Sequence, residues 1–424
     1  MKVLFLTEIP DPRVGSSVRQ MYQEARRLRE LGHEAVVVST VRDAADATPT
    51  EIEGTRVYRL HSDYPVRWRA WVSLHNKVID APLDAILREE QPDVVHAHLV
   101  HTHLGYHSLT QAARSGAAVV FTAHDVMTFC YQKLTCFHGG EAHGGELYDI
   151  EARLSKCIPC QRGRFRPGRN GRIKVVLDRD VDRFTVVSDA LGEVLSANGI
   201  RVDATVHNAI ELGAEVSDQD VAAFRARLGL EGKQVLAIGG RLHSQKGVGK
   251  LLEMLALLRP EFPDVRLLVM GDRQVYDQEF LDQARGLGVD DLVVPTGWLE
   301  GAELRLAYGA ADVFVTPSIC FDTFGLVNLE AMEHRKPVVA TSFGGSKEVV
   351  VEGETGFICN PFHLQAFTAR LGQLLRDPGL RRRQGQAGYV LLQQRFTIER
   401  LTEEFLEVYR AAVASKRGLE KRVL

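Results

Sequence analysis

Short continuous apolar runs alternate with longer amphipathic segments along the whole chain. Residues 3–6 and 35–38 are two such runs, and between them apolar side chains recur at helical spacing from Val18 to Leu31. Strands buried on both faces of a sheet consist of continuous apolar runs, whereas a helix covering a sheet repeats every three or four residues. The alternation therefore predicts βαβ units and an α/β protein with parallel sheets.

The alternation occurs twice, with a restart near Asn208. In the first half, strands are expected at residues 3–6, 35–38, 57–60, 94–97, 119–122, 184–187 and 204–207. In the second half, strands are expected at residues 235–238, 265–269, 292–295, 313–316 and 338–340, with helices at residues 248–258, 279–287, 304–309 and 324–334. The length of 424 residues suits two large α/β domains.

These patterns predict how the chain divides into domains. Residues 1–208 and 209–395 are expected to form two Rossmann-like, doubly wound domains that face a central cleft. A cysteine-bearing insertion is expected near residues 128–175, inside the first domain. Residues 396–424 are expected to form a closing helix that packs back on the first domain.

Charge and hydropathy exclude several classes of protein. The net charge of −3 argues against nucleic acid as a partner, because that binding depends on many phosphate contacts. No apolar run approaches the ~20 residues of a membrane-spanning helix. The apolar opening at residues 2–6 is too short for a signal peptide, since Thr7 and Glu8 interrupt it. A cytoplasmic location is therefore expected.

Two cations follow the first predicted strand of the second half. Gly240 and Arg241 come directly after this strand, and Lys246 stands just before the next predicted helix. Cations and flexible backbone at the carboxyl end of a strand, beside a helix N-terminus, are typical of a phosphate site. A solvated basic loop is the alternative interpretation.

A second segment after a strand carries two carboxylates. Asp322 lies in the expected loop, and Glu330 lies nearly two turns inside a helix that begins near Phe324 or Gly325. This spacing favours acceptors for hydroxyl groups at two ends of one elongated ligand, with phosphate oxygens facing the helix N-terminus between them. A surface aspartate and an ordinary helical glutamate are the alternative.

Paired glycines, Gly344 and Gly345, follow the last predicted strand. Glycine allows a backbone to approach another group closely, and a plain turn is the alternative.

Taken together, these motifs resemble glycosyltransferase family 4, the retaining, nucleotide-sugar-dependent enzymes of the GT-B fold. In the second half the resemblance rests on Gly240-Arg241 with Lys246-Gly247, on Pro317-Ser318 leading to Phe324-Gly325-Leu326-Val327 and Glu330-Ala331-Met332, on Gly344-Gly345 with Glu348, and on Glu354-Thr355-Gly356-Phe357. In the first half it rests on Gly32-His33-Glu34-Ala35, Asp93-Val94-Val95-His96-Ala97-His98 and Thr122-Ala123-His124-Asp125. The order and spacing of these motifs cover nearly the whole chain.

The resemblance implies a role for individual residues. Arg241 and Lys246 are implied to bind the donor diphosphate and to stabilise it as it leaves, so that no catalytic metal or other cofactor is required. Glu330 is implied to hold the ribose hydroxyls, and Asp322 hydroxyls of the transferred sugar. His124 is implied to lie at that sugar from the opposite, acceptor-side lobe. Further donor contacts are implied for Gly15, Gly240 and the backbone amides of Phe324, Gly325 and Leu326.

The chain departs from the family pattern at three positions. Aspartate replaces the usual glutamate at Asp322, only Gly15 stands where the family has a double glycine, and Arg273 replaces a further glycine. These departures bear on the identity of the donor. They also motivate a second hypothesis, a catalytically silent nucleotide-sugar-binding protein.

Four cysteines form a separate candidate metal site. Cys130 and Cys136 precede the pair Cys157 and Cys160, whose Cys-x-x-Cys spacing is typical of zinc ligands. His138 and His143 lie between the two pairs. The sequence therefore predicts structural zinc here, with a disulfide pair and reduced thiols as the alternatives.

Two further segments are candidates for contact with the acceptor. Residues 64–71 mix aromatic and basic side chains, and residues 162–174 are rich in arginine. Either is suited to a lipid surface, as in a peripheral membrane protein, or to an anionic acceptor. A surface helix and a solvated loop are the alternative.

The function that these observations favour is transfer of a sugar from a nucleoside diphosphate sugar to a hydroxyl acceptor, with retention of the anomeric configuration. The acceptor is expected to be a glycan, a lipid-linked molecule or a small molecule. A nucleotide-sugar epimerase of the same fold is a further alternative to the silent binding protein. A nicotinamide dehydrogenase is disfavoured because neither half opens with a G-x-G-x-x-G turn.

Overall fold

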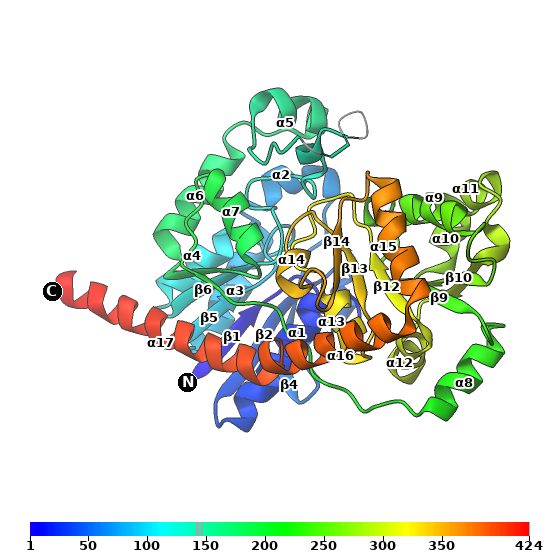
Figure 1. Cartoon of the computed structure of the whole chain (residues 1–424). Coiled ribbons are helices and arrows are strands. Elements are labelled where there is room, and N and C mark those ends of the chain that lie inside the picture. Colours follow the sequence, from blue (N-terminus) through cyan, green and yellow to red (C-terminus); the bar gives the residue numbers. More distant parts are fainter. Residues whose placement is uncertain (141–143, 146, 424) are drawn as a thin grey trace. The chain divides into compact units, whose positions relative to one another are not determined.

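The computed structural model describes residues 1–140, 144–145 and 147–423 (Figure 1). These residues form two compact units. Unit 1 comprises Met1–Leu134, Ile150–Glu211 and Ile398–Leu424, and unit 2 comprises Thr135–Asp149 and Leu212–Thr397. Each unit has its own sheet of mainly parallel strands with helices on it, so the predicted α/β class and the pair of Rossmann-like domains are confirmed.

Unit 1 is built on a sheet with the strand order β3-β4-β2-β1-β5-β6-β7-β8. Its strands are β1 (Lys2–Leu6), β2 (Glu34–Val41), β3 (Thr50–Ile52), β4 (Thr55–His61), β5 (Val94–Ala97), β6 (Ala118–Ala123), β7 (Arg183–Val186) and β8 (Ala204–Thr205). Its helices are α1 (Ser16–Glu30), α2 (Arg69–Val72), α3 (Lys77–Glu90), α4 (His107–Arg114), α5 (Leu154–Gln161), α6 (Arg169–Asp180), α7 (Asp189–Ala197) and α17 (Ile398–Val423).

One edge of this sheet differs from the sequence-based expectation. β3 pairs antiparallel with β4 through a two-residue turn at Glu53 and Gly54, both of which have positive φ. Two successive positive φ angles fit the twist of a tight hairpin, and Gly54 adopts its positive φ without strain. β3 escaped prediction because three residues are too few for a recognisable apolar run.

Unit 2 is built on a sheet with the strand order β11-β10-β9-β12-β13-β14. Its strands are β9 (Gln234–Gly239), β10 (Val265–Met270), β11 (Val293–Gly297), β12 (Val313–Thr316), β13 (Val338–Thr341) and β14 (Gly356–Cys359). Its helices are α8 (Asp218–Arg227), α9 (Val248–Leu258), α10 (Arg273–Glu279), α11 (Leu281–Gly286), α12 (Gly301–Ala310), α13 (Leu326–Glu333), α14 (Ser346–Val349), α15 (Leu364–Arg376) and α16 (Pro378–Arg395).

The single helix expected at residues 279–287 is replaced by two shorter helices, α10 and α11. α10 begins earlier than predicted because Asp272 caps it: the Asp272 carboxylate accepts a hydrogen bond of 2.8 Å from the backbone N–H of Gln274. Capping by a side chain satisfies an amide that the helix itself leaves unpaired.

The last helix, α17, packs on unit 1. It lies against α1 and β6 (Figure 1, red). Its buried residues recur every three or four positions, which makes one continuous apolar stripe. They are Ile398, Leu401, Phe405, Leu406, Tyr409 and Ala412. None of the helices in the described residues is long and apolar enough to cross a bilayer.

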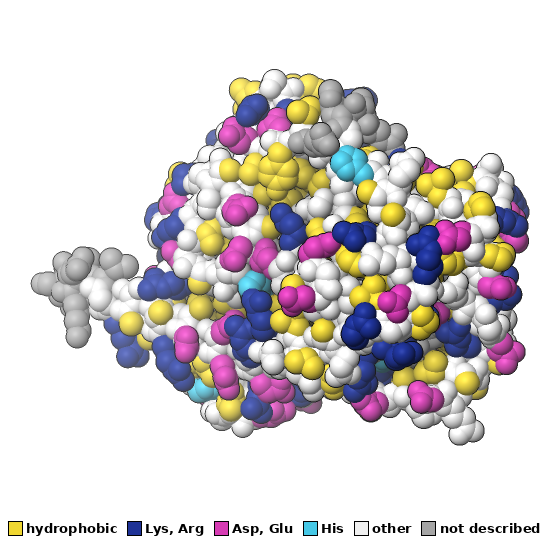
Figure 2. Space-filling view, in the orientation of Figure 1, with side chains coloured by type: hydrophobic (Ala, Val, Ile, Leu, Met, Phe, Trp, Pro, Cys, Tyr) yellow, Lys and Arg dark blue, Asp and Glu magenta, His cyan; other side chains and the backbone are white. Residues whose placement is uncertain are grey.

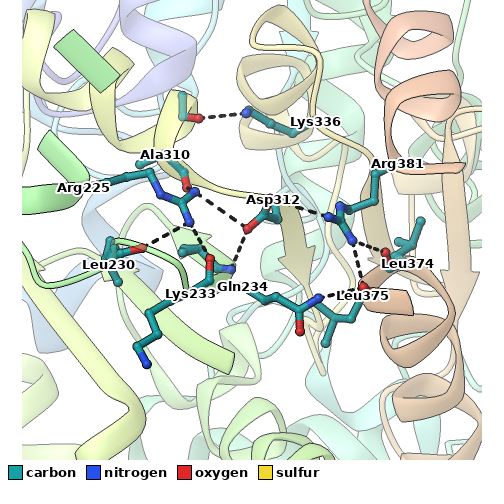
Figure 3. Close-up of polar contacts among 12 residues, drawn as sticks. Arg225, Leu230, Lys233, Gln234, Ala310, Asp312, Lys336, Leu374, Leu375 and Arg381 are labelled. Carbon is teal, nitrogen blue, oxygen red and sulfur yellow. Dashed lines mark hydrogen bonds and ion pairs between the residues drawn. The ribbon is translucent and has the colours of Figure 1, made fainter. Parts of the chain in front are cut away.

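A polar network closes the amino end of β9 and β12 in unit 2 (Figure 3). Asp312 precedes β12 and accepts a hydrogen bond of 2.8 Å from the backbone N–H of Val235. Its carboxylate also lies 3.7 Å from the guanidinium of Arg225 on α8 and 4.0 Å from that of Arg381 on α16. The two helices are thereby held at one end of the sheet, opposite the end that carries the candidate site.

Candidate functional site

The candidate site in unit 2 lies where the strand order reverses. β9 has β10 on one side and β12 on the other, so the connections after these strands diverge. Open α/β sheets bind ligands at such a point, at the carboxyl ends of the strands. The loops that leave this end carry Arg241 after β9, Asp322 after β12 and Gly344 after β13.

Lys246 and Asp322 form an ion pair at this end of the sheet. Lys246 ends the 3₁₀ helix Ser244–Lys246, and its Nζ lies 2.9 Å from Oδ2 of Asp322. The Ser318 hydroxyl donates a second hydrogen bond of 3.1 Å to the same oxygen. Burial is the largest single influence and lowers the pKa of Lys246, but the charge and hydrogen bond of Asp322, together with the charge of Cys320, outweigh it, so the pKa is raised overall. Lys246 is therefore a fixed cation at neutral pH.

Arg241 adds a second cation beside Lys246. It is exposed and follows Gly240, whose φ is +101°. The positive charge of Arg241 acts to lower the pKa of Lys246, because a like charge disfavours the protonated form of the lysine.

Close backbone packing fixes the loop that carries Lys246. Gly247 has φ +77°, and a Cβ there would lie 1.8 Å from the carbonyl oxygen of Pro317. The backbone N–H of Ile319 donates a 2.9 Å hydrogen bond to the carbonyl of Gln245. Only glycine fits at position 247, because the loop after β9 packs directly against the loop after β12 there.

The paired glycines hold the backbone of Asp322. Gly344 has φ +89°, and a Cβ there would lie 2.0 Å from the Asp322 carbonyl oxygen. That oxygen also accepts a 2.8 Å hydrogen bond from the backbone N–H of Gly345. The predicted close approach at this motif therefore has a defined partner, the backbone of Asp322.

The N-terminus of α13 lies next to Asp322. Gly325 caps this helix with φ +83°, and a Cβ there would lie 2.6 Å from the Asn328 side-chain nitrogen. The buried Asn328 in turn accepts a 2.9 Å hydrogen bond from the hydroxyl of Thr316. The backbone of Phe324, Gly325 and Leu326 thus forms the positive end of a helix dipole, which favours an anion.

Glu330 is oriented by a residue that the sequence did not single out. The Tyr308 hydroxyl on α12 donates a 2.6 Å hydrogen bond to Oε2 of Glu330 on α13. The Tyr308 ring stacks on His334 with a centroid distance of 5.7 Å. A tyrosine in an amphipathic helix carries no sequence signal for this contact, because its partner lies on a different helix.

His124 follows β6 in unit 1, within a cluster of buried histidines. Its Nε2 lies 2.8 Å from Nδ1 of His98, which follows β5. Burial lowers the pKa of His124 to about 4, although the charge of Asp125 opposes this shift, and it lowers the pKa of His98 well below its ordinary value. Both rings are therefore neutral at physiological pH, able to form hydrogen bonds without carrying a charge.

Gly15, the remaining predicted donor contact, is the N-cap of α1 in unit 1. Its backbone is extended, and a Cβ there would meet Val18 at an ordinary 3.6 Å. Nothing in the packing of unit 1 requires glycine at this position.

The four cysteines are divided between the two units. Cys157 and Cys160 lie on α5 and Cys130 precedes that helix in unit 1, whereas Cys136 belongs to unit 2. His143 lies outside the described residues. Three groups of described side chains have ligand atoms close enough together for a metal ion, and none of these groups contains the cysteines. Structural zinc stays a prediction.

Comparisons with known proteins match both units. The profile described as Glycosyltransferase Family 4 matches residues 17–213, and that of Glycosyl transferases group 1 matches residues 220–390. An alpha-maltose-1-phosphate synthase from Mycolicibacterium smegmatis is 30% identical over 356 residues, which cover 80% of this chain and 84% of that protein. A D-inositol 3-phosphate glycosyltransferase from Segniliparus rotundus is 29% identical, over 83% of this chain and 78% of that protein.

Solved structures show the same fold at low sequence identity. A sucrose-phosphate synthase from Thermosynechococcus elongatus aligns with a TM-score of 0.75 and 19% identity, over 98% of this chain and 100% of that one. The Anabaena protein HepE, solved in complex with UDP-glucose, aligns with a TM-score of 0.73 and 20% identity, over 97% and 100% of the two chains. The chain therefore belongs to glycosyltransferase family 4 and is a glycosyltransferase with the GT-B fold.

Proposed function

We propose that the chain transfers a sugar from a nucleoside diphosphate sugar to a hydroxyl acceptor, with retention of the anomeric configuration. The observation that carries this proposal is the grouping of Lys246, Arg241, the α13 N-terminus and Asp322 at the switch point of the unit 2 sheet. HepE, which has the same fold, was solved with UDP-glucose, and that title supports a nucleotide-sugar donor here.

The two cations stabilise the leaving group. In the transfer, the anomeric carbon exchanges its bond to a phosphate oxygen for a bond to the acceptor oxygen, and the acceptor proton leaves with the nucleoside diphosphate or the solvent. Negative charge grows on the departing diphosphate, where Lys246 and Arg241 are preorganised to receive it. Lys246 has three N–H donors, so it can contact phosphate oxygens while it still holds Asp322.

The neutral and acidic groups bind the sugars. Asp322 accepts hydrogen bonds from hydroxyls of the transferred sugar, while Glu330, held by Tyr308, accepts those of the ribose. His124 is assigned to the transferred sugar by the family resemblance, and burial lowers its pKa to about 4, so that its ring is neutral. A neutral ring adds a hydrogen bond without an ion pair that would compete with the diphosphate.

We infer that the transfer step needs no metal ion, because the two cations take the role that Mg²⁺ has in other phosphate sites. Brief assays with EDTA should then retain most of the activity, and complete dependence on Mg²⁺ would reject this inference. Zinc at the four cysteines is a separate prediction, and metal analysis of freshly purified, reduced protein tests it without an activity assay.

Product analysis tests the proposed function. The protein is incubated with UDP-glucose, GDP-mannose or ADP-glucose and a panel of hydroxyl acceptors, and the products are identified by NMR. A new glycoside with the anomeric configuration of the donor supports the proposal, and an inverted glycoside contradicts retention. An altered sugar nucleotide without a glycoside would favour the epimerase. Tight donor binding with no turnover would favour the silent binding protein.

A further inference from the structure

Two segments of unit 1 that lie about 95 residues apart in the sequence pack against each other. The guanidinium of Arg166 donates hydrogen bonds of 3.1 and 3.4 Å to the carbonyls of Trp71 and Ala70 at α2. Its central carbon also lies 5.9 Å from the centroid of the Trp71 ring. In the reverse direction, Arg69 donates a 2.8 Å hydrogen bond to the carbonyl of Tyr131, whose hydroxyl lies 3.2 Å from the Arg166 carbonyl. The aromatic segment before α2 and the arginine-rich segment after α5 are thus held together.

The outward side chains of this region are apolar as well as basic. We name it the Trp–Arg surface and define it by the exposed residues Val66, Trp68, Leu154, Ile158, Arg162 and Arg164. The four apolar side chains are 47–67% exposed. Figure 2 shows a hydrophobic patch at the place of α2, and hydrophobic side chains among charged ones at the place of α5.

The helix α5 presents its apolar side chains to solvent. Leu154 and Ile158 lie one turn apart, so they share a stripe on the helix, and the side chain that α5 buries is the polar Gln161. A helix of a globular domain normally buries its apolar stripe and exposes its polar residues. The reversed arrangement leaves the apolar stripe of α5 exposed.

The charge of the same region is strongly positive. Residues 150–175 contain eight lysines and arginines but one acid, Glu151, in a chain whose net charge is −3. Burial and the nearby charge of Arg172 lower the pKa of Arg166. Such a concentration of cations is suited to an anionic partner.

We propose that the Trp–Arg surface docks on the anionic face of a lipid bilayer. Tryptophan and branched aliphatic side chains enter the interface between headgroups and acyl chains, and neighbouring arginines pair with lipid phosphates. Trp68 and Ile158 are the side chains that would enter the interface, and Arg162 and Arg164 are those that would pair with lipid phosphates. Docking of this kind needs no membrane-spanning helix. It is also independent of sugar transfer, since no donor or catalytic residue takes part.

A vesicle assay tests the proposal with the full chain. Co-sedimentation is measured with phosphatidylcholine vesicles that contain or lack phosphatidylglycerol, at low and high salt. The protein should bind the anionic vesicles, and salt should weaken the binding. Absence of binding, or equal binding to vesicles of phosphatidylcholine alone, would overturn the proposal.

Variants then locate the surface. Arg162→Gln/Arg164→Gln should weaken binding to anionic vesicles by roughly fivefold per arginine. Trp68→Ser/Ile158→Ser should leave the salt dependence in place while it lowers the affinity at least about tenfold. The matched controls are Trp298→Ser, a tryptophan that is 53% exposed in unit 2, and Arg382→Gln/Arg383→Gln, an exposed arginine pair on α16.

Three results would assign the surface to another occupant and reject the proposal. One is control variants that lose vesicle binding as strongly as the Trp–Arg variants do. A second is a dimer in sedimentation that Trp68→Ser dissociates, which would indicate a second copy of the chain. A third is a protein that does not bind vesicles but binds a single-stranded oligonucleotide in a salt-sensitive way, with this binding lost in the arginine variant. Thermal melting of each variant confirms that exposed substitutions leave the fold intact.

Discussion

Lys246 Nζ lies 2.9 Å from Asp322 Oδ2, so the cation that follows β9 is paired with the carboxylate that follows β12. The proposed function assigns Lys246 to the donor diphosphate and Asp322 to the transferred sugar. Without a donor, the two side chains neutralise each other. Each charge therefore holds the other in place before the donor arrives. Such preorganisation is what electrostatic stabilisation of a leaving group requires.

Removing either cation should reduce turnover while the fold is kept. We expect Lys246→Ala and Arg241→Ala each to lower kcat by about 100- to 1000-fold, because each deletes a fixed positive charge from the leaving diphosphate. Lys233→Ala is the matched control, since Lys233 lies before β9 and pairs with Asp264 at 2.6 Å, at the other end of the sheet. Steady-state kinetics with the true donor check this, and near-normal turnover in both site variants would contradict it.

Changing Asp322 should separate transfer from nucleotide binding. Asp322→Asn removes the negative charge that neutralises Lys246, so nucleoside diphosphate affinity should stay equal or rise, whereas transfer should fall by about 100-fold. Asp322→Glu should also lower transfer, because the glycine pair holds the backbone of Asp322 and a longer side chain misplaces its carboxylate. Calorimetry with UDP, GDP and ADP, together with turnover, measures both effects. Unchanged transfer in the Asn variant would remove Asp322 from the sugar site.

Substitution of Gly344 should cost more than substitution of a glycine with the same backbone. Gly344 and Gly353 both have positive φ, but a Cβ at 344 would lie 2.0 Å from the Asp322 carbonyl, whereas nothing lies within 4 Å at 353. Gly353→Ala should lose only the backbone preference, about 1–2 kcal/mol. Gly344→Ala should lose at least about 2 kcal/mol more, and activity with it, since overpacking forces the backbone apart. Equal unfolding midpoints in denaturant would argue against this close approach.

Removing the Tyr308 hydroxyl should weaken donor binding. Its 2.6 Å hydrogen bond orients Glu330, so Tyr308→Phe should raise the donor KM roughly tenfold with a smaller change in kcat. Tyr276→Phe is the control, because the buried Tyr276 hydroxyl has no hydrogen-bond partner among the described residues. A KM shift that is equal in the two variants would show that Tyr308 does not act through Glu330.

The stability of unit 1 should depend on the protonation of Glu24. This residue on α1 is buried beside Tyr409 and His96, and burial raises its pKa to about 8, although the hydrogen bond from Tyr409 opposes the shift. A raised pKa gives stability that is full below the unfolded value of 4.5 and is lost as the pH rises through about 8.

The free energy of unfolding should thus fall between about pH 4.5 and 8, by at most about 1.4 kcal/mol per pH unit from this group, and this component should level off above about pH 8. Glu24→Gln should remove this component, because glutamine keeps the shape and an acceptor for Tyr409 but does not titrate. Denaturant unfolding across this range measures the slope. The same slope in both proteins would mean that Glu24 is not the group responsible.

The sequence predicted elements best where a pattern is continuous and buried. β5 at residues 94–97 and α9 at residues 248–258 have the predicted bounds, because an unbroken apolar run and a regular apolar stripe are local properties. β3 and the split of residues 279–287 into α10 and α11 were missed, since both depend on short-range turn and capping geometry.

The sequence named the residues of the candidate site but not the contacts between them. Lys246 and Asp322 were both expected to bind the donor, yet their pairing joins residues that are 76 positions apart. The contact of Tyr308 with Glu330 and that of Glu24 with Tyr409 cross between helices in the same way. Periodicity reports which face of an element is buried, and it carries no information about what that face meets.

Thermal shift with nucleoside diphosphate sugars tests the central claim most directly, because a ligand that binds only the folded state raises the melting temperature. UDP-glucose, GDP-mannose and ADP-glucose are compared on the unmodified chain, on Arg241→Ala/Lys246→Ala and on the control Lys233→Ala. At least one donor should raise the melting temperature of the unmodified chain and of the control, and should leave the double variant unshifted. No shift with any donor, or the same shift in the double variant, would contradict the assignment of the donor diphosphate to these two cations.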